Sequence, residues 1–289
     1  MITAKKIIKY FYLILLVWLA LLSFILFIEV RHHDLEFYVF DVGQGDAILI
    51  RTPAKQNILI DGGPDNSVVY KLGKYLPFYD RSIDLMILTH PHADHLIGLI
   101  EVLKRYKVKN ILAVGVDCQQ AEYLVWLDLI KEKNINVLIA NQPEIFYFSG
   151  GIKLIILYPD KSFFNQPVEN FNNVSIVAKL IYGQTEIMLT GDFENEEILV
   201  NKNLDLAADI LKVGHHGSNT ANSPLFLRAV SPDWAVISCG EDNKFNHPHG
   251  DTVNSLLNLP SDILRTDQSG DVIFFSDGID IRPVEYQYP

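Results

Sequence analysis

Seven of the nine histidines of this chain fall into three short clusters, and each cluster follows a predicted strand. The densest cluster is THPHADH, residues 89–95, which comes after the apolar run 84–88 and before a segment with apolar residues at helical spacing. Histidine and carboxylate side chains are common ligands of transition metals in proteins. This segment therefore favours a fold that presents such a loop at the edge of a sheet.

The spacing within residues 89–95 indicates how many ions the loop can serve. His90 and His92 are two residues apart in an extended segment, so their side chains project to the same side. Asp94 and His95 lie at the start of the next helix, where they can reach a second position. Four such side chains are more than one tetrahedral ion takes from so tight a loop, which predicts two neighbouring metals. The alternative is a solvated helix start with Asp94 as its cap.

From Leu35 onward, short β-branched and aromatic runs alternate with helical patterns, which predicts an α/β domain. The predicted strands are 37–40, 47–51, 57–60, 82–89, 111–114, 137–140, 153–158, 174–182, 186–189, 210–213, 234–238 and 271–275. The predicted helices are 96–106, 121–133, 194–201, 224–229 and 252–258. The first three strands are expected to form an antiparallel meander. Each half of the chain has strands first and helices after, which predicts two packed sheets with helices outside.

An uncharged run of 19 residues, from Tyr10 to Ile28, precedes this domain. A helix of that length rises about 28 Å, close to the hydrocarbon thickness of a bilayer. Lysines before the run place the N-terminus in the cytoplasm. Residues 1–30 are therefore predicted to be a single-pass signal anchor in the cell membrane, and residues 31–289 an extracytoplasmic domain. A cleaved signal peptide is the alternative, although the run lacks a small-x-small cleavage site after it.

The chain has 35 acidic and 24 basic side chains, which gives a formal net charge of −11. Broad non-specific binding to a polyanion depends on lysine and arginine, so any contact with nucleic acid is expected to be local and not a long basic track. Cys118 and Cys239 are too few for a disulfide framework or a four-cysteine metal site. They are interpreted as two buried thiols, with a single bridge as the alternative.

A set of motifs occurs along the chain in a fixed order. Besides residues 89–95, the set contains DVGQGDA (41–47), IDGG (60–63), TGD (190–192), KVGHHGS (212–218), NHPH (246–249) and RTDQSG (265–270). The His-x-His-x-Asp-His segment resembles the signature of the metallo-β-lactamase fold. The whole set resembles the extracellular hydrolase-like domain of ComEC-type late-competence proteins, over about residues 35–281. The resemblance implies an αββα four-layer sandwich whose members are mostly hydrolases with one or two metal ions at a sheet edge.

The chain departs from this family in two respects. ComEC-type proteins carry a multi-span channel and an extra β domain, whereas a single predicted helix precedes the domain here, which argues against DNA transport by this chain alone. Most two-metal enzymes of the fold have one more histidine between the first cluster and the aspartate at the later strand end. Here no histidine lies between His95 and His215, and NNVS, residues 172–175, occupies that place.

By position, the resemblance implies that Asp192 bridges two divalent ions. The ligands it implies are His90, His92 and Asp192 for the first ion, and Asp94, His95, Asp192 and His216 for the second. The first ion is then one protein ligand short, and water, Asn173 or His247 could fill the position, or one ion alone is firmly held. Zinc is the expected metal and manganese the alternative, because histidine and carboxylate ligands serve both.

Catalysis is expected to depend on Asp61, Asp94 and His215, and the resemblance implies that Asp61 steadies the first loop by hydrogen bonding. His215 is assigned to no metal and is the candidate proton donor to the leaving oxygen, with the orientation of a neighbouring ligand as an equal alternative. The expected substrate contacts are Ser218, His247 and Asp46, in loops that also contain His249. Asp46 equally fits a cap of its glycine turn.

These expectations together predict a membrane-anchored, metal-dependent hydrolase. A metal pair held by imidazole and carboxylate can lower the pKa of bound water to about 7 and neutralise a phosphate in the transition state. The predicted reaction is phosphodiester hydrolysis by a metal-bound hydroxide, on DNA or on a smaller or cell-surface phosphodiester. The alternative from another class is a non-catalytic, metal-containing module that binds DNA or a partner in competence-type DNA uptake. A lactamase or thioester hydrolase is a third option.

Overall fold

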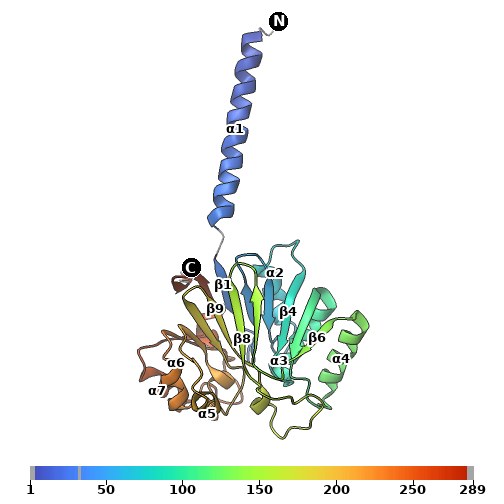
Figure 1. Ribbon diagram of the computed structural model, residues 1–289, viewed down its shortest axis with the longest axis vertical. Helices are drawn as coiled ribbons and strands as arrows, with labels where there is room; N and C mark the ends of the chain where they lie inside the picture. Colours follow the sequence, from blue (N-terminus) through green and yellow to red (C-terminus); the bar gives the residue numbers. More distant parts are fainter. Residues whose placement is uncertain (1–3, 32–33, 285–289) are drawn as a thin grey trace.

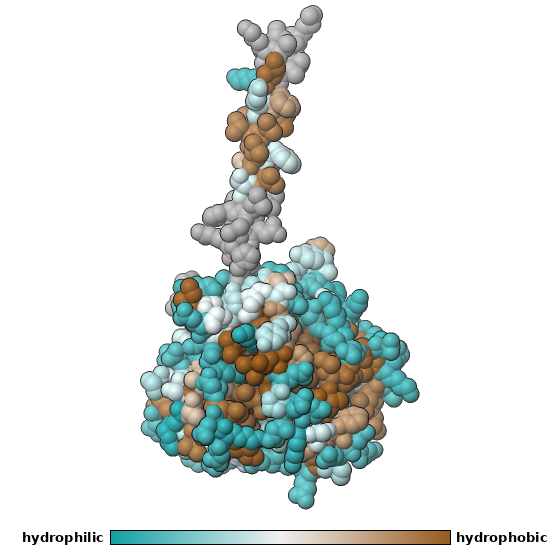
Figure 2. Space-filling model, in the orientation of Figure 1, coloured by the Kyte–Doolittle hydropathy of each residue, from teal (hydrophilic) through white to brown (hydrophobic). Residues whose placement is uncertain are grey.

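The computed structural model describes residues 4–31 and 34–284. It begins with helix α1 (Ala4–Arg31), which projects away from the rest of the chain and leads into an α/β domain (Figure 1). Side chains of α1 are described for residues 6 and 8–23, and apolar ones cover much of its length (Figure 2). Within the described residues, no helix combines the length and the apolar character that a bilayer crossing requires. The transmembrane helix expected for residues 1–30 is therefore not supported.

Two mixed sheets form the centre of the domain. The first sheet has the order β15-β14-β1-β2-β3-β4-β5-β6, with β1 (Leu35–Val39), β2 (Ile48–Arg51), β3 (Asn57–Ile60), β4 (Ser82–Leu88), β5 (Lys107–Ala113), β6 (Asn136–Ile139), β14 (Val272–Ser276) and β15 (Ile281–Pro283). The second has the order β13-β12-β11-β10-β9-β8-β7, with β7 (Glu144–Phe148), β8 (Ile152–Tyr158), β9 (Val177–Tyr182), β10 (Thr185–Leu189), β11 (Ile210–Lys212), β12 (Trp234–Ile237) and β13 (Asp262–Arg265).

Helices cover the outer faces of both sheets (Figure 1). Those beside the first sheet are α2 (Ser67–Tyr75), α3 (Ala93–Arg105) and α4 (Ala121–Lys133). Those that follow strands of the second sheet are α5 (Glu197–Asn201), α6 (Pro224–Val230), α7 (Gly250–Leu257) and the short α8 (Thr266–Ser269), with 3-10 turns η1 (Asn172–Val174) and η2 (Gly214–Gly217). The expected arrangement of two sheets with helices outside is confirmed.

The strands of the second sheet show why this layering is stable. On β10, Ile187 and Leu189 belong to the apolar core between the sheets, whereas Met188 belongs to a second core beneath the outer helices. Successive strand residues point to opposite faces, so an unbroken apolar strand buries both faces at once. Cys239 lies in the second core and Cys118 in the first, and both thiols are free and buried, as interpreted from the sequence.

The structure corrects several expected elements. Residues 172–174, expected to begin a strand, form η1, and β9 begins only at Val177. Five further elements were not expected: α2, β7, β13, α8 and β15. The two halves of the chain also do not correspond to the two sheets, because β14 returns to pair with β1, with Ser276 opposite Leu35. The antiparallel meander of β1, β2 and β3 is confirmed.

Strand direction determines where the motif residues lie. β3 and β4 are parallel neighbours, as are β10, β11 and β12, so the residues that follow each group lie at one edge. Glycines bring the loop after β3 against α3: Gly62 N–H donates to His95 O at 2.7 Å, and a Cβ on Gly98 would lie 1.8 Å from Gly62 O. A side chain at Gly98 would therefore push the first turn of α3 away from the sheet.

Candidate metal centre

Three loops bring a cluster of imidazoles and carboxylates together at this edge. The cluster contains His90, His95, Asp192 and His216, each 1% exposed or less. His95 Nε2 lies 3.3 Å from Asp192 Oδ2, and His216 Nε2 lies 3.6 Å from the same oxygen. Asp94 Oδ2 completes the group at 3.4 Å from His216 Nε2. The four residues expected around the second ion therefore converge on one point.

The residues expected around the first ion converge less completely. His90 Nε2 lies 3.7 Å from Asp192 Oδ2, and His92 Nδ1 lies 3.0 Å from His90 Nε2. His92 is only half-buried, and its ring also packs edge-on against Phe171, with 5.6 Å between centroids. The three residues therefore offer one carboxylate and two imidazole nitrogens beside the second group, and His92 is the one half-buried member among them.

The donor set fits a divalent ion. Ligand atoms about 2.0–2.1 Å from a tetrahedral ion stand about 3.3–3.4 Å apart, close to the distances around Asp192 Oδ2. His95 Nε2 and His216 Nε2, which lie 3.3 Å and 3.6 Å from Asp192 Oδ2, are buried without a hydrogen-bond partner in the described structure. Buried polar atoms are rarely left without a partner, because each costs about 1–3 kcal/mol. Their grouping at one point is the observation that the binding of a cation would explain.

Asp61 orders the first histidine loop. Its Oδ1 accepts from Thr89 N–H at 2.9 Å, and its Oδ2 accepts from Thr89 Oγ1 at 2.7 Å and from His95 Nδ1 at 2.8 Å. The hydroxyl of Thr89 in turn lies 3.1 Å from His90 Nδ1. These partners assign the protons of both imidazoles to Nδ1, which leaves the Nε2 lone pairs of His90 and His95 facing the centre. The steadying role expected of Asp61 fits this geometry.

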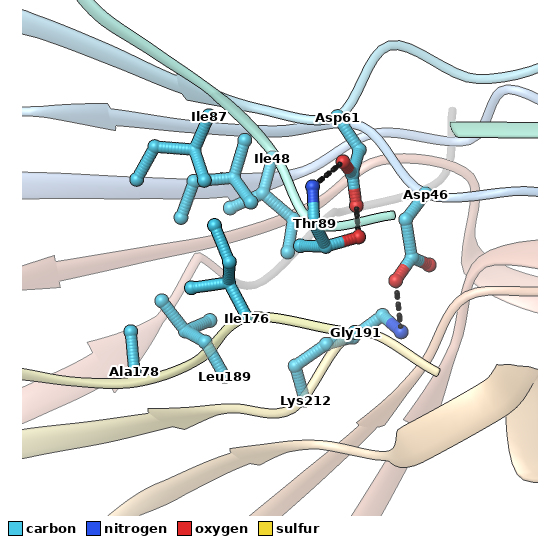
Figure 3. A pocket seen from close by; sticks show the side chains of 11 residues that line it. Asp46, Ile48, Asp61, Ile87, Thr89, Ile176, Ala178, Leu189, Gly191 and Lys212 are labelled. Carbon is cyan, nitrogen blue, oxygen red and sulfur yellow. Dashed lines mark hydrogen bonds and ion pairs between the residues drawn. The ribbon is translucent and has the colours of Figure 1, made fainter. Parts of the chain in front are cut away.

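Asp46 lies behind the centre and not in the open site. It is 1% exposed and forms an ion pair of 2.8 Å with Lys212 Nζ, and Figure 3 shows the pair beside a cavity of about 10 Å³. Its Oδ1 lies 3.4 Å from His216 Nδ1, which donates to Ser238 O at 3.0 Å. The substrate contact expected of Asp46 is therefore corrected: a side chain buried in an ion pair cannot meet a ligand from solvent, and it faces the back of His216.

Charges in the cluster shift the proton affinities of its members. Burial alone would lower the pKa of His95, but Asp192, Asp61 and Asp94 raise the pKa well above the usual value. His216 shows the same balance, because Asp192 and Asp46 overcome burial and raise its pKa to about 10. Burial alone would raise the pKa of Asp192, but the two imidazoles hold it well below the usual range. The carboxylates thus stabilise positive charge at this point, either as protons on the imidazoles or as a bound cation.

His215 lies at the mouth of the cluster with a partner that the sequence did not reveal. Its Nδ1 lies 3.2 Å from Glu194 Oε1 and 3.1 Å from Thr220 Oγ1, and its Nε2 lies 3.8 Å from Asp192 Oδ2. Thr220 Oγ1 donates to the same Glu194 oxygen at 2.7 Å. Glu194 follows the TGD motif by two residues, which is the one local signal that could have identified it.

The remaining expected contacts divide into two groups. His247 lies near the centre, with its ring 5.5 Å from that of His215 and its Nδ1 3.3 Å from Gln44 Nε2. Burial and the nearby His216 and His215 lower its pKa to about 4. Ser218 is instead buried, with its hydroxyl 3.0 Å from Thr220 Oγ1, so the expected substrate contact is corrected to a bond within the loop.

His249 and the asparagines of η1 form hydrogen bonds outside the histidine cluster or none in the described structure. His249 Nδ1 accepts from Asn219 N–H at 3.0 Å, which uses that nitrogen in a bond to the loop after η2. Asn172 Nδ2 donates to Glu194 Oε1 at 3.2 Å, so η1 is tied to the partner of His215. Asn173 Oδ1 is buried without a hydrogen-bond partner within the described residues. It stays the candidate for the position that a histidine fills in other members of the fold.

The backbone that presents His215 and His216 is strained. Both residues have positive φ, 47° and 54°, inside η2. A non-glycine residue in the left-handed region costs about 1–2 kcal/mol. Asn222 holds the turn: its side chain accepts from Gly214 N–H at 2.9 Å and donates to Gly214 O at 2.9 Å. The two adjacent histidines are thereby directed to different sides, His216 inward and His215 toward the mouth.

Comparisons with known proteins agree with this architecture. The sequence model of the Metallo-beta-lactamase superfamily matches residues 40–241. ComE operon protein 3 of Bacillus subtilis is 29% identical over 257 residues, 82% of this chain and 32% of its own length. Competence protein ComA of Neisseria gonorrhoeae is 30% identical over 243 residues, 82% of this chain and 31% of its own length. The chain thus spans about a third of the length of these relatives.

Solved structures show the same fold at low sequence identity. The metallo-beta-lactamase fold protein YhfI from Bacillus subtilis has a TM-score of 0.51 at 13% identity, over 80% of this chain and 95% of its own. The metallo hydrolase Igni18 from Ignicoccus hospitalis has a TM-score of 0.52 at 14% identity, over 88% of this chain and 100% of its own. Fold and site together define a domain with the metal-dependent hydrolase fold and a candidate metal centre. The chain belongs to the metallo-beta-lactamase superfamily, and the resemblance to ComEC-type competence proteins is confirmed.

Proposed function

We propose that this chain is a metal-dependent phosphodiesterase whose centre takes one or two divalent ions. The observation that supports it most is the pair of buried, unpartnered ring nitrogens on His95 and His216 that face Asp192 Oδ2. Asp94 would complete the position of His95 and His216, and His90 and His92 the second one around the shared Asp192. A divalent ion at such a site supplies positive charge to phosphoryl oxygens and lowers the pKa of water, which is chemistry suited to phosphoester hydrolysis.

The protein's own residues provide orientation and a proton. Asp61 holds the tautomers of the first loop, and the Asp46–Lys212 pair lies behind His216. Thr220 Oγ1 lies 3.1 Å from His215 Nδ1 and donates to Glu194, whose Oε1 lies 3.2 Å from the same nitrogen, so Nδ1 is engaged within the protein and the nitrogen available for proton transfer is Nε2, on the side of Asp192. We propose that His215 gives a proton from Nε2 to the leaving oxygen and that Glu194 fixes its ring.

The test uses the full chain loaded with zinc or manganese and a chromogenic phosphodiester. Asp192→Asn is expected to lose metal and activity together, since it removes the shared ligand. His215→Gln should lower kcat by about 10²–10⁴-fold with the metal content unchanged. His249→Gln is the matched control, because His249 bonds to the backbone of Asn219 and not to the centre. Activity that persists in Asp192→Asn would contradict the proposal.

A second candidate function is a non-catalytic metal-containing module that binds DNA or a partner. The less complete grouping of His90, His92 and Asp192, with asparagines in place of a further histidine, favours it. If the chain binds metal but cleaves no phosphodiester, phosphomonoester, lactam or thioester with any of several divalent ions, this candidate replaces the first.

The substrate class and the place of action are proposals as well. The net charge of −11 favours a small or surface-bound phosphodiester over a long nucleic acid. Nuclease activity should fall steeply with added salt, whereas cleavage of a small ester should not. We further propose that α1 holds the chain at a membrane, because its described apolar side chains from Ile8 to Leu22 are largely exposed. Flotation of the full chain with neutral vesicles tests this.

A further inference from the structure

A concave surface rich in basic side chains lies at the end of the domain opposite the metal centre. Its lining includes five basic residues and no acidic one: Lys104, Arg105, Lys107, Lys109 and Lys133. All five basic side chains are exposed. On a chain with a net charge of −11, such a local excess of positive charge is not expected from composition alone.

Exposed aromatic side chains stand beside this hollow, in the loop between α2 and β4. Phe78 is 87% exposed and Tyr79 is 76% exposed, and their rings meet edge to face at 5.3 Å. Arg81 connects the loop to the hollow, because its guanidinium lies 5.4 Å from the centre of the Tyr106 ring and its carbonyl accepts from Lys107 N–H at 2.8 Å. We call these two aromatics, Arg81 and the five basic residues the basic–aromatic surface.

Strand direction places this surface on the side from which α1 leaves. β1 is antiparallel to β2, and β2 to β3, while β3, β4 and β5 are parallel, so β1, β4 and β5 all begin at the same edge. α1 ends at Arg31 and β1 begins at Leu35. Figure 1 shows the α2–β4 loop reaching up beside the base of α1, and Figure 2 shows hydrophilic residues over the right-hand part of that end. The metal centre follows the other ends of the strands, about 20 Å away along β4.

A simpler explanation accounts for only part of the surface. Lys104 and Arg105 lie in the last turn of α3, and Lys133 in the last turn of α4, where cations complement the helix dipole. Glu101 pairs with Lys104 and Arg105, and Asp84 pairs with Lys109. Neither the helix dipole nor an ion pair accounts for Lys107, and neither accounts for the two exposed aromatic side chains, Phe78 and Tyr79. Aromatic rings beside lysine and arginine are typical of protein surfaces at the membrane–water interface.

We propose that the basic–aromatic surface binds the anionic headgroups of a phospholipid bilayer. Phe78 and Tyr79 enter the headgroup layer while the five basic side chains contact lipid phosphates, and the metal centre faces away from the bilayer. Nucleic acid fits less well, because a strand lying on this surface would be about 20 Å from the groups that would cleave it. The proposal takes from the proposed function only that α1 holds the chain at a membrane.

The test measures partitioning of the full chain between water and vesicles, either neutral phosphatidylcholine or phosphatidylcholine with 30% phosphatidylserine. Binding to neutral vesicles reports on α1, and the difference between the two vesicles reports on the surface. Each basic residue near an anionic bilayer is worth about fivefold in binding. The double variant Lys107→Gln/Lys133→Gln should therefore bind anionic vesicles about 25-fold more weakly and neutral vesicles equally well. The matched control is Lys161→Gln/Arg228→Gln, which changes the same charge at other exposed positions.

A second measurement detects the contact itself. The two native cysteines are buried, so Tyr79→Cys can carry an environment-sensitive fluorophore, and its emission should shift to the blue with anionic vesicles. Equal loss in the test and control variants, or no blue shift at position 79, would overturn the proposal. So would a double variant that loses affinity for a labelled DNA duplex and keeps its affinity for anionic vesicles. Failure of all forms to bind neutral vesicles would instead count against the role of α1.

Discussion

Asp61→Asn is the sharpest test of how the centre is organised. The substitution keeps size and shape but replaces one carboxylate oxygen by an amide nitrogen. Both oxygens of Asp61 now accept from donors: Oδ1 from Thr89 N–H, and Oδ2 from Thr89 Oγ1 and His95 Nδ1. Whichever oxygen becomes NH₂, a donor then faces a donor. The least costly relief is for His95 to accept at Nδ1 and carry its proton at Nε2.

That change of tautomer removes the lone pair that would bind a metal. Substituting the hydrogen-bond partner of a metal-binding histidine typically weakens metal affinity 10–100-fold, or about 1.4–2.8 kcal/mol. The three bonds of Asp61 are all buried, at 2.7–2.9 Å, so we expect the upper part of that range. Asp192 and His216 keep their positions, so metal binding should be weakened and not abolished.

The assay is competition for zinc and manganese against a chelator of known affinity, with unfolding in urea measured in parallel. Asp271→Asn is the matched control, because that carboxylate is also buried and accepts from Asp41 N–H and Tyr75 Oη, away from the centre. The control should lose stability and keep its metal affinity. An Asp61→Asn protein that is folded and binds metal within twofold of the wild type would refute the tautomer argument.

Three further predictions follow from buried groups. Burial raises the pKa of Glu196 to about 7 from 4.5, so the native state holds its proton more tightly and stability falls as pH rises from 4.5 through 7. In urea titrations, the free energy of unfolding of Glu196→Gln should therefore exceed that of the wild type by about 1–3 kcal/mol at pH 8 and equal it at pH 4.5. An equal gain in stability at both pH values would contradict this. Because the pKa of His216 is about 10 and that of His95 is also raised, metal binding at pH 7 should displace protons, and affinity should rise from pH 6 to 8 by at least about tenfold per pH unit, which chelator competition can measure. A flat profile would be inconsistent with that balance. Gly98→Ala should destabilise the fold by about 2 kcal/mol or more in denaturant, because the added Cβ would lie 1.8 Å from Gly62 O. This loss should exceed the gain from the better helix propensity of alanine. Unchanged stability would show that α3 can shift.

The candidate site was predictable because its chemistry is local in the sequence. Four of the ligand-type residues lie within six positions of the sequence: His90, His92, Asp94 and His95. The TGD and GHHGS motifs also follow strands directly. Parallel strands carry their ends to one edge, so residues that end such strands meet without any further information. The same reasoning failed for Ser218 and Asp46, because a motif shows which residues are near a site and not which way each side chain turns.

The sequence by itself determined the α/β class, the two-sheet arrangement and the set of ligand-type residues, because each follows from periodicity or from residue type over a few positions. Only the tertiary structure decided the contacts between distant segments. The Asp46–Lys212 pair joins the glycine turn to β11, Glu194 meets His215 across a strand end, and β14 returns to the first sheet. The basic–aromatic surface likewise combines residues of two helices, a strand and a loop. Such contacts depend on how whole elements pack, which short-range patterns do not encode.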